Sequence, residues 1–238
     1  MGKDPAERLA GFVGELSTAM GDTLSSVVLF GSIPRGEARE GVSDVNLLLL
    51  LRAADRATLL RGAPVAQRWR EEVGVPLLFT PDEWRRSADV FPVEVADMLD
   101  HRRVLMGPDP LPGLEVSLEH MRLQVERELR GKIVQMRRGV FLAADHPADL
   151  GRLLLGAAPS LATYLRAVLR LAGQPVPAST ADVIRAACPR VGAAAEPFLE
   201  VWGARERPAA FEPDASCTDG VIELMLGTAH YVDTLEGR

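Results

Sequence analysis

This chain of 238 residues has few cysteines and few aromatic residues, and its basic residues do not outnumber its acidic ones. Cys188 and Cys217 are the only cysteines, too few and too far apart for a metal knuckle, a CxxC redox pair or a disulfide framework. We therefore expect two buried free thiols. With a net charge of −6 and 5% aromatic residues, the chain lacks basic tracts interleaved with aromatics, so nucleic acid is not an expected partner.

Long apolar runs are missing as well. No stretch approaches the roughly 20 apolar residues that span a bilayer, and residues 1–12 lack the apolar core of a signal peptide. We therefore expect a cytoplasmic protein that does not contact a membrane. Apolar residues still make up 47% of the chain, which is enough for a substantial core.

The segment GPDPLPG at residues 107–113 is the predicted domain boundary. Its prolines lack backbone donors and resist helix formation, which favours an extended connector. Strand-like and helix-like segments alternate before it, whereas the segments after it have a helical pattern. We therefore predict domains at residues 1–107 and 114–238, joined by a linker at residues 108–113.

The first domain is predicted to combine helices with buried strands. An apolar stripe at Leu9, Phe12 and Leu16 indicates an amphipathic helix that begins near residue 5. Apolar runs without alternation indicate strands that are covered on both faces. Strands are predicted at residues 26–30, 45–51, 75–79, 93–98 and 103–106, and helices at residues 55–72, with a break at 62–64, and at 81–88.

The second domain is predicted to be a helical bundle. Apolar residues at spacings of three and four indicate a long helix over residues 114–144, in which Gly131 could mark a close helix crossing. Further helices are predicted at residues 149–171, 180–187, 193–204 and 219–235.

Gly31 and Ser32 follow the first predicted strand and are suited to phosphate binding. A glycine at a strand exit lets a phosphate approach backbone N–H groups closely, and the serine hydroxyl adds a donor. Taken alone, the pair is also an ordinary turn. A P-loop would need GxxxxGK[ST], and this chain has Glu37 and Ala38 in place of the lysine and the hydroxyl residue.

Asp44 and Asn46 stand two residues apart at the entry of the next predicted strand, so their side chains point to the same face. Together with Gly31 and Ser32 they could surround one Mg²⁺-triphosphate. The stretch FGSIPRGEAREGVSDVNLLL resembles the nucleotidyltransferase superfamily, which includes DNA polymerase β and the aminoglycoside nucleotidyltransferases. The resemblance implies an α+β fold, with an N-terminal mixed sheet flanked by helices and a C-terminal α-helical bundle.

By this resemblance, Gly31 and Ser32 hold the β and γ phosphates of an NTP, and Asp44, a catalytic residue, binds Mg²⁺ together with Asn46. The superfamily uses two metal ions, about 3.5–4 Å apart, for in-line displacement. Asn46 departs from its pattern, because an amide lacks the negative charge that Mg²⁺ favours. One lost charge at about 4 Å is worth on the order of 4 kcal/mol at an effective dielectric near 20, partly offset by desolvation. A single Mg²⁺ could survive this loss, whereas the two-metal step becomes doubtful.

The third carboxylate of the superfamily, a metal ligand or general base, would be Glu94 or Asp97. We choose Glu94 as catalytic residue and metal ligand, because it lies centrally in a predicted strand, and expect Asp97 at the surface. Arg35 could contact a phosphate as a nucleotide-binding residue, or pair with Glu37 or Glu40 in a solvated turn.

Three functions follow. The first is a Mg²⁺-dependent nucleotidyltransferase that moves a nucleoside monophosphate from NTP to a small-molecule or protein acceptor. The second, suggested by Asn46, is a catalytically impaired relative that binds nucleotide or a partner protein. The third, a toxin–antitoxin component with a helical RNase domain, has less support, because no Arg followed by four to six residues and His occurs in the helical half. The C-terminal helices could instead supply a substrate lid or a homodimer surface.

Overall fold

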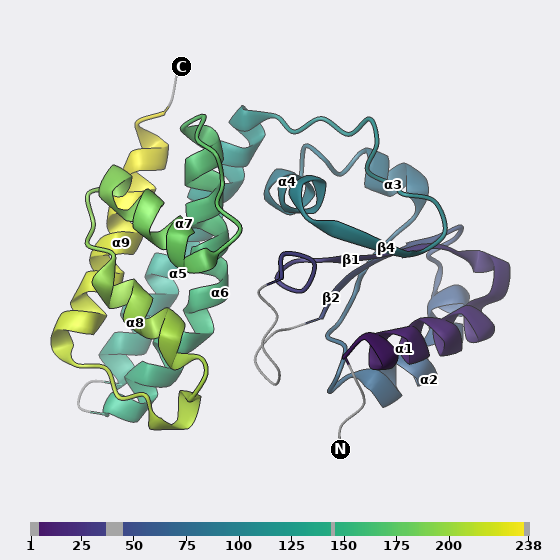
Figure 1. Cartoon of the computed structure of the whole chain (residues 1–238), viewed down its shortest axis with the longest axis horizontal. Helices are drawn as coiled ribbons and strands as arrows, with labels where there is room; N and C mark the ends of the chain where they lie inside the picture. Colours follow the sequence, from purple (N-terminus) through teal and green to yellow (C-terminus); the bar gives the residue numbers. More distant parts are fainter. Residues whose placement is uncertain (1–4, 37–44, 144–145, 236–238) are drawn as a thin grey trace. The chain divides into compact units, whose positions relative to one another are not determined.

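The computed structural model describes residues 5–36, 45–143 and 146–235. The chain divides into two compact units, Met1–Val116 and Ser117–Arg238. The first contains a mixed sheet flanked by helices and the second is helical, which confirms the predicted α+β class (Figure 1). Each unit is described separately below.

The first unit is built on a four-stranded sheet in the order β3-β2-β1-β4. β1 runs antiparallel to both β2 and β4, whereas β2 and β3 are parallel. Phe30 at the end of β1 pairs with Asn46 at the start of β2, so these two strand ends lie side by side at one end of the sheet. The elements of this unit are α1 (Pro5–Met20), a 3-10 turn (Gly21–Thr23), β1 (Leu24–Phe30), β2 (Asn46–Leu51), α2 (Arg56–Trp69), β3 (Leu77–Phe79), α3 (Pro81–Arg85), α4 (Pro92–Asp100) and β4 (Arg102–Met106).

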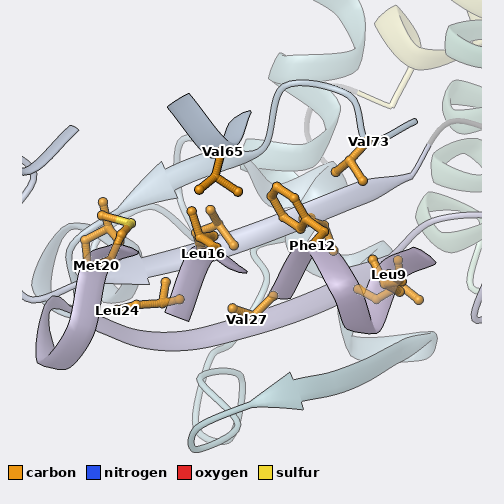
Figure 2. Close-up of a cluster of buried hydrophobic side chains, with 12 residues drawn as sticks. Leu9, Phe12, Leu16, Met20, Leu24, Val27, Val65 and Val73 are labelled. Carbon is orange, nitrogen blue, oxygen red and sulfur yellow. The ribbon is translucent and has the colours of Figure 1, made fainter. Parts of the chain in front are cut away.

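Alternate residues of β1 and β2 face two separate hydrophobic clusters. Val27 and Leu49 belong to a cluster with α1 and α2, part of which is shown in Figure 2. Their neighbours Val28 and Leu48 belong to a second cluster, to which α3 contributes Trp84 and α4 contributes residues of its buried face. Helices therefore cover both faces of the sheet (Figure 1), as the unbroken apolar runs predict.

The strand predicted at residues 93–98 is wrong, because this segment lies within helix α4. Pro92 occupies the first turn, where its missing N–H leaves no hydrogen bond unmade. Val95 and Met98, three residues apart, are both fully buried in the second cluster. The β-branched valines suggest a strand, but the period of the buried positions is helical.

The predicted helix break at residues 62–64 and the predicted helix crossing at Gly131 are also wrong. α2 continues through Pro64 without a break, with Val65 buried against the first cluster. Gly62 marks close helix packing instead, since a Cβ there would lie 3.1 Å from Sδ of Met20 in α1. In the second unit, Gly131 has open space around it, so it does not mark a helix crossing.

The second unit consists of helices, as predicted. Among its described helices, α6 contributes the most core residues, and its buried face includes Leu154, Leu161 and Leu165. Among the described residues, no helix is both long and apolar enough to cross a membrane. The elements are α5 (Leu118–Ala143), α6 (Pro147–Leu171), α7 (Thr180–Ala187), a 3-10 turn (Cys188–Val191), α8 (Glu196–Ala204), a second 3-10 turn (Pro208–Ala210) and α9 (Ala215–Asp233).

Cys188 and Cys217 are buried free thiols, as predicted. Burial raises the pKa of each thiol to about 11, so only about one thiol in a thousand is ionised at pH 8. We expect iodoacetamide to label neither cysteine at pH 8 in the folded protein and both in urea, as measured by intact mass. The folded thiols hold their protons more tightly than unfolded ones, so this contribution to stability disappears as pH rises through about 9 to 11. Rapid labelling without urea would contradict the burial.

Candidate functional site

The candidate site lies where β1 ends and β2 begins. Gly31 follows the last residue of β1 and has a positive φ of 85°, a conformation that other residues rarely adopt. Asn46, the first residue of β2, is exposed, and its side-chain amide lies against Gly31. A Cβ on Gly31 would stand 2.6 Å from Nδ2 of Asn46. The structure therefore brings two of the predicted site residues into direct contact.

The residues after Gly31 form a compact turn. The backbone N–H of Gly36 donates to the carbonyl of Ile33 at 3.1 Å, and Gly36 also has a positive φ, of 77°. Ile33 packs against the hydrophobic cluster on the α1 and α2 side of the sheet. Ser32, the predicted phosphate ligand, lies in this turn and is half-buried. We refer to residues 31–36 as the glycine turn.

Arg35 forms an ion pair with Asp97 of α4. Nη1 of Arg35 lies 2.6 Å from Oδ2 of Asp97, and the two side chains are only 9% and 11% exposed. The expected surface position of Asp97 is wrong, because that carboxylate is buried where α4 covers the sheet. Glu37 and Glu40, the partners suggested for Arg35, lie outside the described residues.

Glu94, the predicted third carboxylate, lies in the first turn of α4 and is half-buried. Glu94 therefore does not occupy the centre of a strand, the position predicted for it. Glu94 and Asp97 are nevertheless three residues apart on one helix, so they share a side of it. Because Asp97 contacts Arg35, that side of α4 is turned toward the glycine turn. The catalytic role of Glu94 stays a prediction.

α4 is fixed by a second arginine. Arg102, which pairs with Phe30 in the sheet, donates to the carbonyls of Met98 and Leu99 at the end of α4. The same guanidinium binds both carboxylate oxygens of Asp109, at 3.0 and 3.2 Å from Nε. These hydrogen bonds from Arg102 hold the pKa of Asp109 below its usual range. Arg102 therefore ties α4 and the connector after β4 to the sheet.

The described residues do not supply the ligands of a two-metal centre. Asp44, the predicted principal ligand, lies outside them. Within the described ranges, no group of three His, Cys, Asp or Glu side chains is placed to hold a metal ion. The described part of the predicted set is one neutral amide, on Asn46, and one carboxylate, on Glu94.

The ion pair between Arg35 and Asp97 is the feature that sequence reasoning misses. A signal is present: Glu94 and Asp97 have the spacing of residues on one helix side, and apolar residues occupy the other positions of that segment. Recognising the helix would have placed Asp97 with Glu94 rather than at the surface. Its partner could not have been named, because the two residues are 62 positions apart.

Comparison with known proteins identifies the fold. No family model and no curated protein sequence matches this chain. Among solved structures, it resembles spectinomycin adenyltransferase AAD(9) from Enterococcus faecialis, whose crystal structure contains ATP and spectinomycin. The TM-score is 0.55 at 11% sequence identity, and the match covers 97% of this chain and 99% of the other. The chain thus has the fold of a nucleotidyltransferase, a mixed sheet flanked by helices followed by a helical region.

Proposed function

We propose that this protein binds a nucleoside triphosphate, with one Mg²⁺ ion, at the glycine turn. The observation that carries the proposal is the contact between Gly31 and Asn46 at the end of the sheet. A glycine with positive φ allows a turn whose backbone N–H groups can face a phosphate, and the side-chain amide of Asn46, whose nitrogen is the atom nearest Gly31, lies at the same end of the sheet. The solved structure with a similar fold contains ATP, which supports the choice of a nucleotide.

In this proposal, Gly31 and Ser32 contact the β and γ phosphates through backbone N–H groups and the serine hydroxyl. Asp44 and the side-chain oxygen of Asn46 hold the Mg²⁺ ion that the triphosphate also coordinates. The amide is neutral where the superfamily has a carboxylate, so the site carries one negative charge less. This favours one weakly bound Mg²⁺ ion over a pair of metal ions. We therefore place nucleotide binding first and group transfer second.

Transfer of a nucleoside monophosphate to a small-molecule or protein acceptor is the second candidate function. It is favoured by the adenyltransferase match, which covers nearly all of both chains. In this case Glu94 would act as general base from α4. Labelled ATP, Mg²⁺ and either spectinomycin or a metabolite mixture test it, with pyrophosphate release and acceptor mass as readouts. Activity that disappears in Asp44→Ala supports transfer, and binding without turnover supports the first candidate alone.

Calorimetry with ATP and Mg²⁺ tests nucleotide binding directly, using Gly31→Ala and Gly36→Ala as a matched pair. Both glycines have positive φ, so alanine introduces backbone strain of about 1–2 kcal/mol at either position. Only at Gly31 does the new methyl group also displace the Asn46 amide, since Gly36 has open space around it. We expect at least an approximately tenfold loss of ATP affinity in Gly31→Ala and less than about a threefold loss in Gly36→Ala.

Two outcomes would count against the proposal. If the unaltered protein binds no ATP with Mg²⁺ or Mn²⁺, the glycine turn is not a phosphate site. If the two alanine variants lose affinity equally, backbone strain in the turn explains the loss and the contact between Gly31 and Asn46 has no separate role.

A further inference from the structure

We propose that Asp97 is a positioning residue: its ion pair with Arg35 holds the glycine turn in the shape that receives phosphate. This inference rests on the proposed nucleotide site. In this inference, Arg35 anchors the turn to α4, whereas on the sequence alone it is considered as a phosphate ligand.

Burial makes this ion pair unlike an ordinary surface pair. The two side chains are 9% and 11% exposed, whereas Arg68 and Glu15, which pair between α2 and α1, are 58% and 43% exposed. Exposed pairs contribute little because water screens them and both long side chains must be ordered. A charge-assisted hydrogen bond that is largely removed from water is stronger, and removing one partner leaves the other charge buried.

The glycine turn is attached to both faces of the sheet. Ile33 packs into the cluster formed with α1 and α2, on one face. Arg35 reaches Asp97 on α4, which covers the opposite face through Val95 and Met98. With Gly31 packed on Asn46, the turn is held across the end of the sheet. Without the ion pair, Arg35 would lose this hydrogen bond to α4.

α4 is a firm support for this attachment. Its apolar side is buried among strand residues of the second cluster, and Arg102 of β4 donates to the carbonyls of Met98 and Leu99. Asp97 therefore presents its carboxylate from an element that is fixed at its buried face and at its end. A turn that is ordered before binding loses less conformational freedom when phosphate binds, which favours affinity.

Hydrogen–deuterium exchange tests the positioning role without any nucleotide. We expect peptides that cover the glycine turn to exchange at least about tenfold faster in Asp97→Asn than in the unaltered protein. Ser26→Ala is the matched control, because it removes buried hydrogen bonds to the carbonyls of Met106 and Pro108 in the same unit without touching the turn. Unchanged exchange in Asp97→Asn, or equal acceleration of the turn in Ser26→Ala, would overturn the inference.

Calorimetry with Mg-ATP on Arg35→Gln, Asp97→Asn and the double variant then separates anchoring from direct contact. We expect each single variant to bind about tenfold more weakly and the double variant to bind no more weakly than either, since both changes remove one interaction. The double variant removes both charges of the pair together, so it remains informative if a single variant misfolds. Additive losses would show that Arg35 contacts the phosphate itself and would overturn the inference.

The two experiments also distinguish failure of the inference from failure of the proposed function. Faster exchange of the turn in Asp97→Asn, with no ATP binding by the unaltered protein, would support the anchor and reject the nucleotide site. ATP binding by the unaltered protein, with unchanged exchange and affinity in Asp97→Asn, would support the nucleotide site and reject the anchor.

Discussion

Replacing Asn46 by aspartate is expected to raise the affinity for Mg-ATP by about ten- to a thousandfold. The physical reason is the restored negative charge beside the proposed metal position. At about 4 Å and an effective dielectric near 20, one unit charge is worth on the order of 4 kcal/mol, of which desolvation removes a large part. Asn46 is exposed at the start of β2, so the substituted carboxylate fits without any repacking of the core.

Calorimetry in the presence of Mg²⁺ and in the presence of EDTA measures this effect. The gain should require Mg²⁺, because in EDTA the new carboxylate only repels the triphosphate. Asn46→Ala serves as the control, since it removes the amide without adding charge and should bind Mg-ATP no more tightly than the unaltered protein. Equal affinity of Asn46→Asp and the unaltered protein would show that residue 46 does not face the metal.

The same variant predicts a Mg²⁺-dependent change in stability. Asp44 and a carboxylate at position 46 would lie two residues apart, so without a metal ion their repulsion lowers the free energy of unfolding. Binding of Mg²⁺ to the folded state relieves the repulsion and adds its own linkage term. Thermal unfolding should therefore shift upward with Mg²⁺ in Asn46→Asp by more than in the unaltered protein. Release of pyrophosphate by this variant would further show that the missing acid limits transfer.

The sequence is sufficient to predict the sheet strands on either side of the candidate site. Continuous apolar runs around Val28 and Leu48 predict strands covered on both faces, and the structure has separate clusters on the two faces. The place of Gly31 at the exit of the first strand is also predictable, and its positive φ is a conformation for which glycine is the usual residue. These features depend on residues that are close together in the sequence.

The environment of Glu94, the predicted third carboxylate, could not be predicted in the same way. The segment around Glu94 is short and rich in β-branched residues, so local preference suggests a strand, whereas burial of Val95 and Met98 against the sheet stabilises a helix. The partner of Asp97 depends on how α4 lies across the sheet relative to Arg35. Such tertiary contacts between distant residues leave no periodic pattern in a single sequence.

Gly107→Ala is expected to destabilise the first unit by about 4 kcal/mol, near the upper end of single substitutions. Gly107 follows β4 and has a φ of 75°. A Cβ there would lie 2.0 Å from the carbonyl oxygen of Ser25 and 3.0 Å from Cα of Ser26, both backbone atoms of β1. Unlike the end of a flexible side chain, a strand backbone cannot move aside without breaking the sheet, so the overlap must separate β1 from β4.

Gly113→Ala isolates that overlap from backbone strain. Gly113 has a φ of 86° in the same connector, but open space surrounds its Cα, so alanine there adds only the strain of about 1–2 kcal/mol. Urea unfolding of the two variants should differ by about 2–3 kcal/mol, and equal losses would contradict a steric origin. The difference should persist because the Ser26 hydroxyl donates to the carbonyls of Met106 and Pro108, at 3.2 and 2.8 Å. These bonds tie both chain neighbours of Gly107 to β1. The segment around Gly107 and the β1 backbone therefore cannot move apart to make room for a new methyl group.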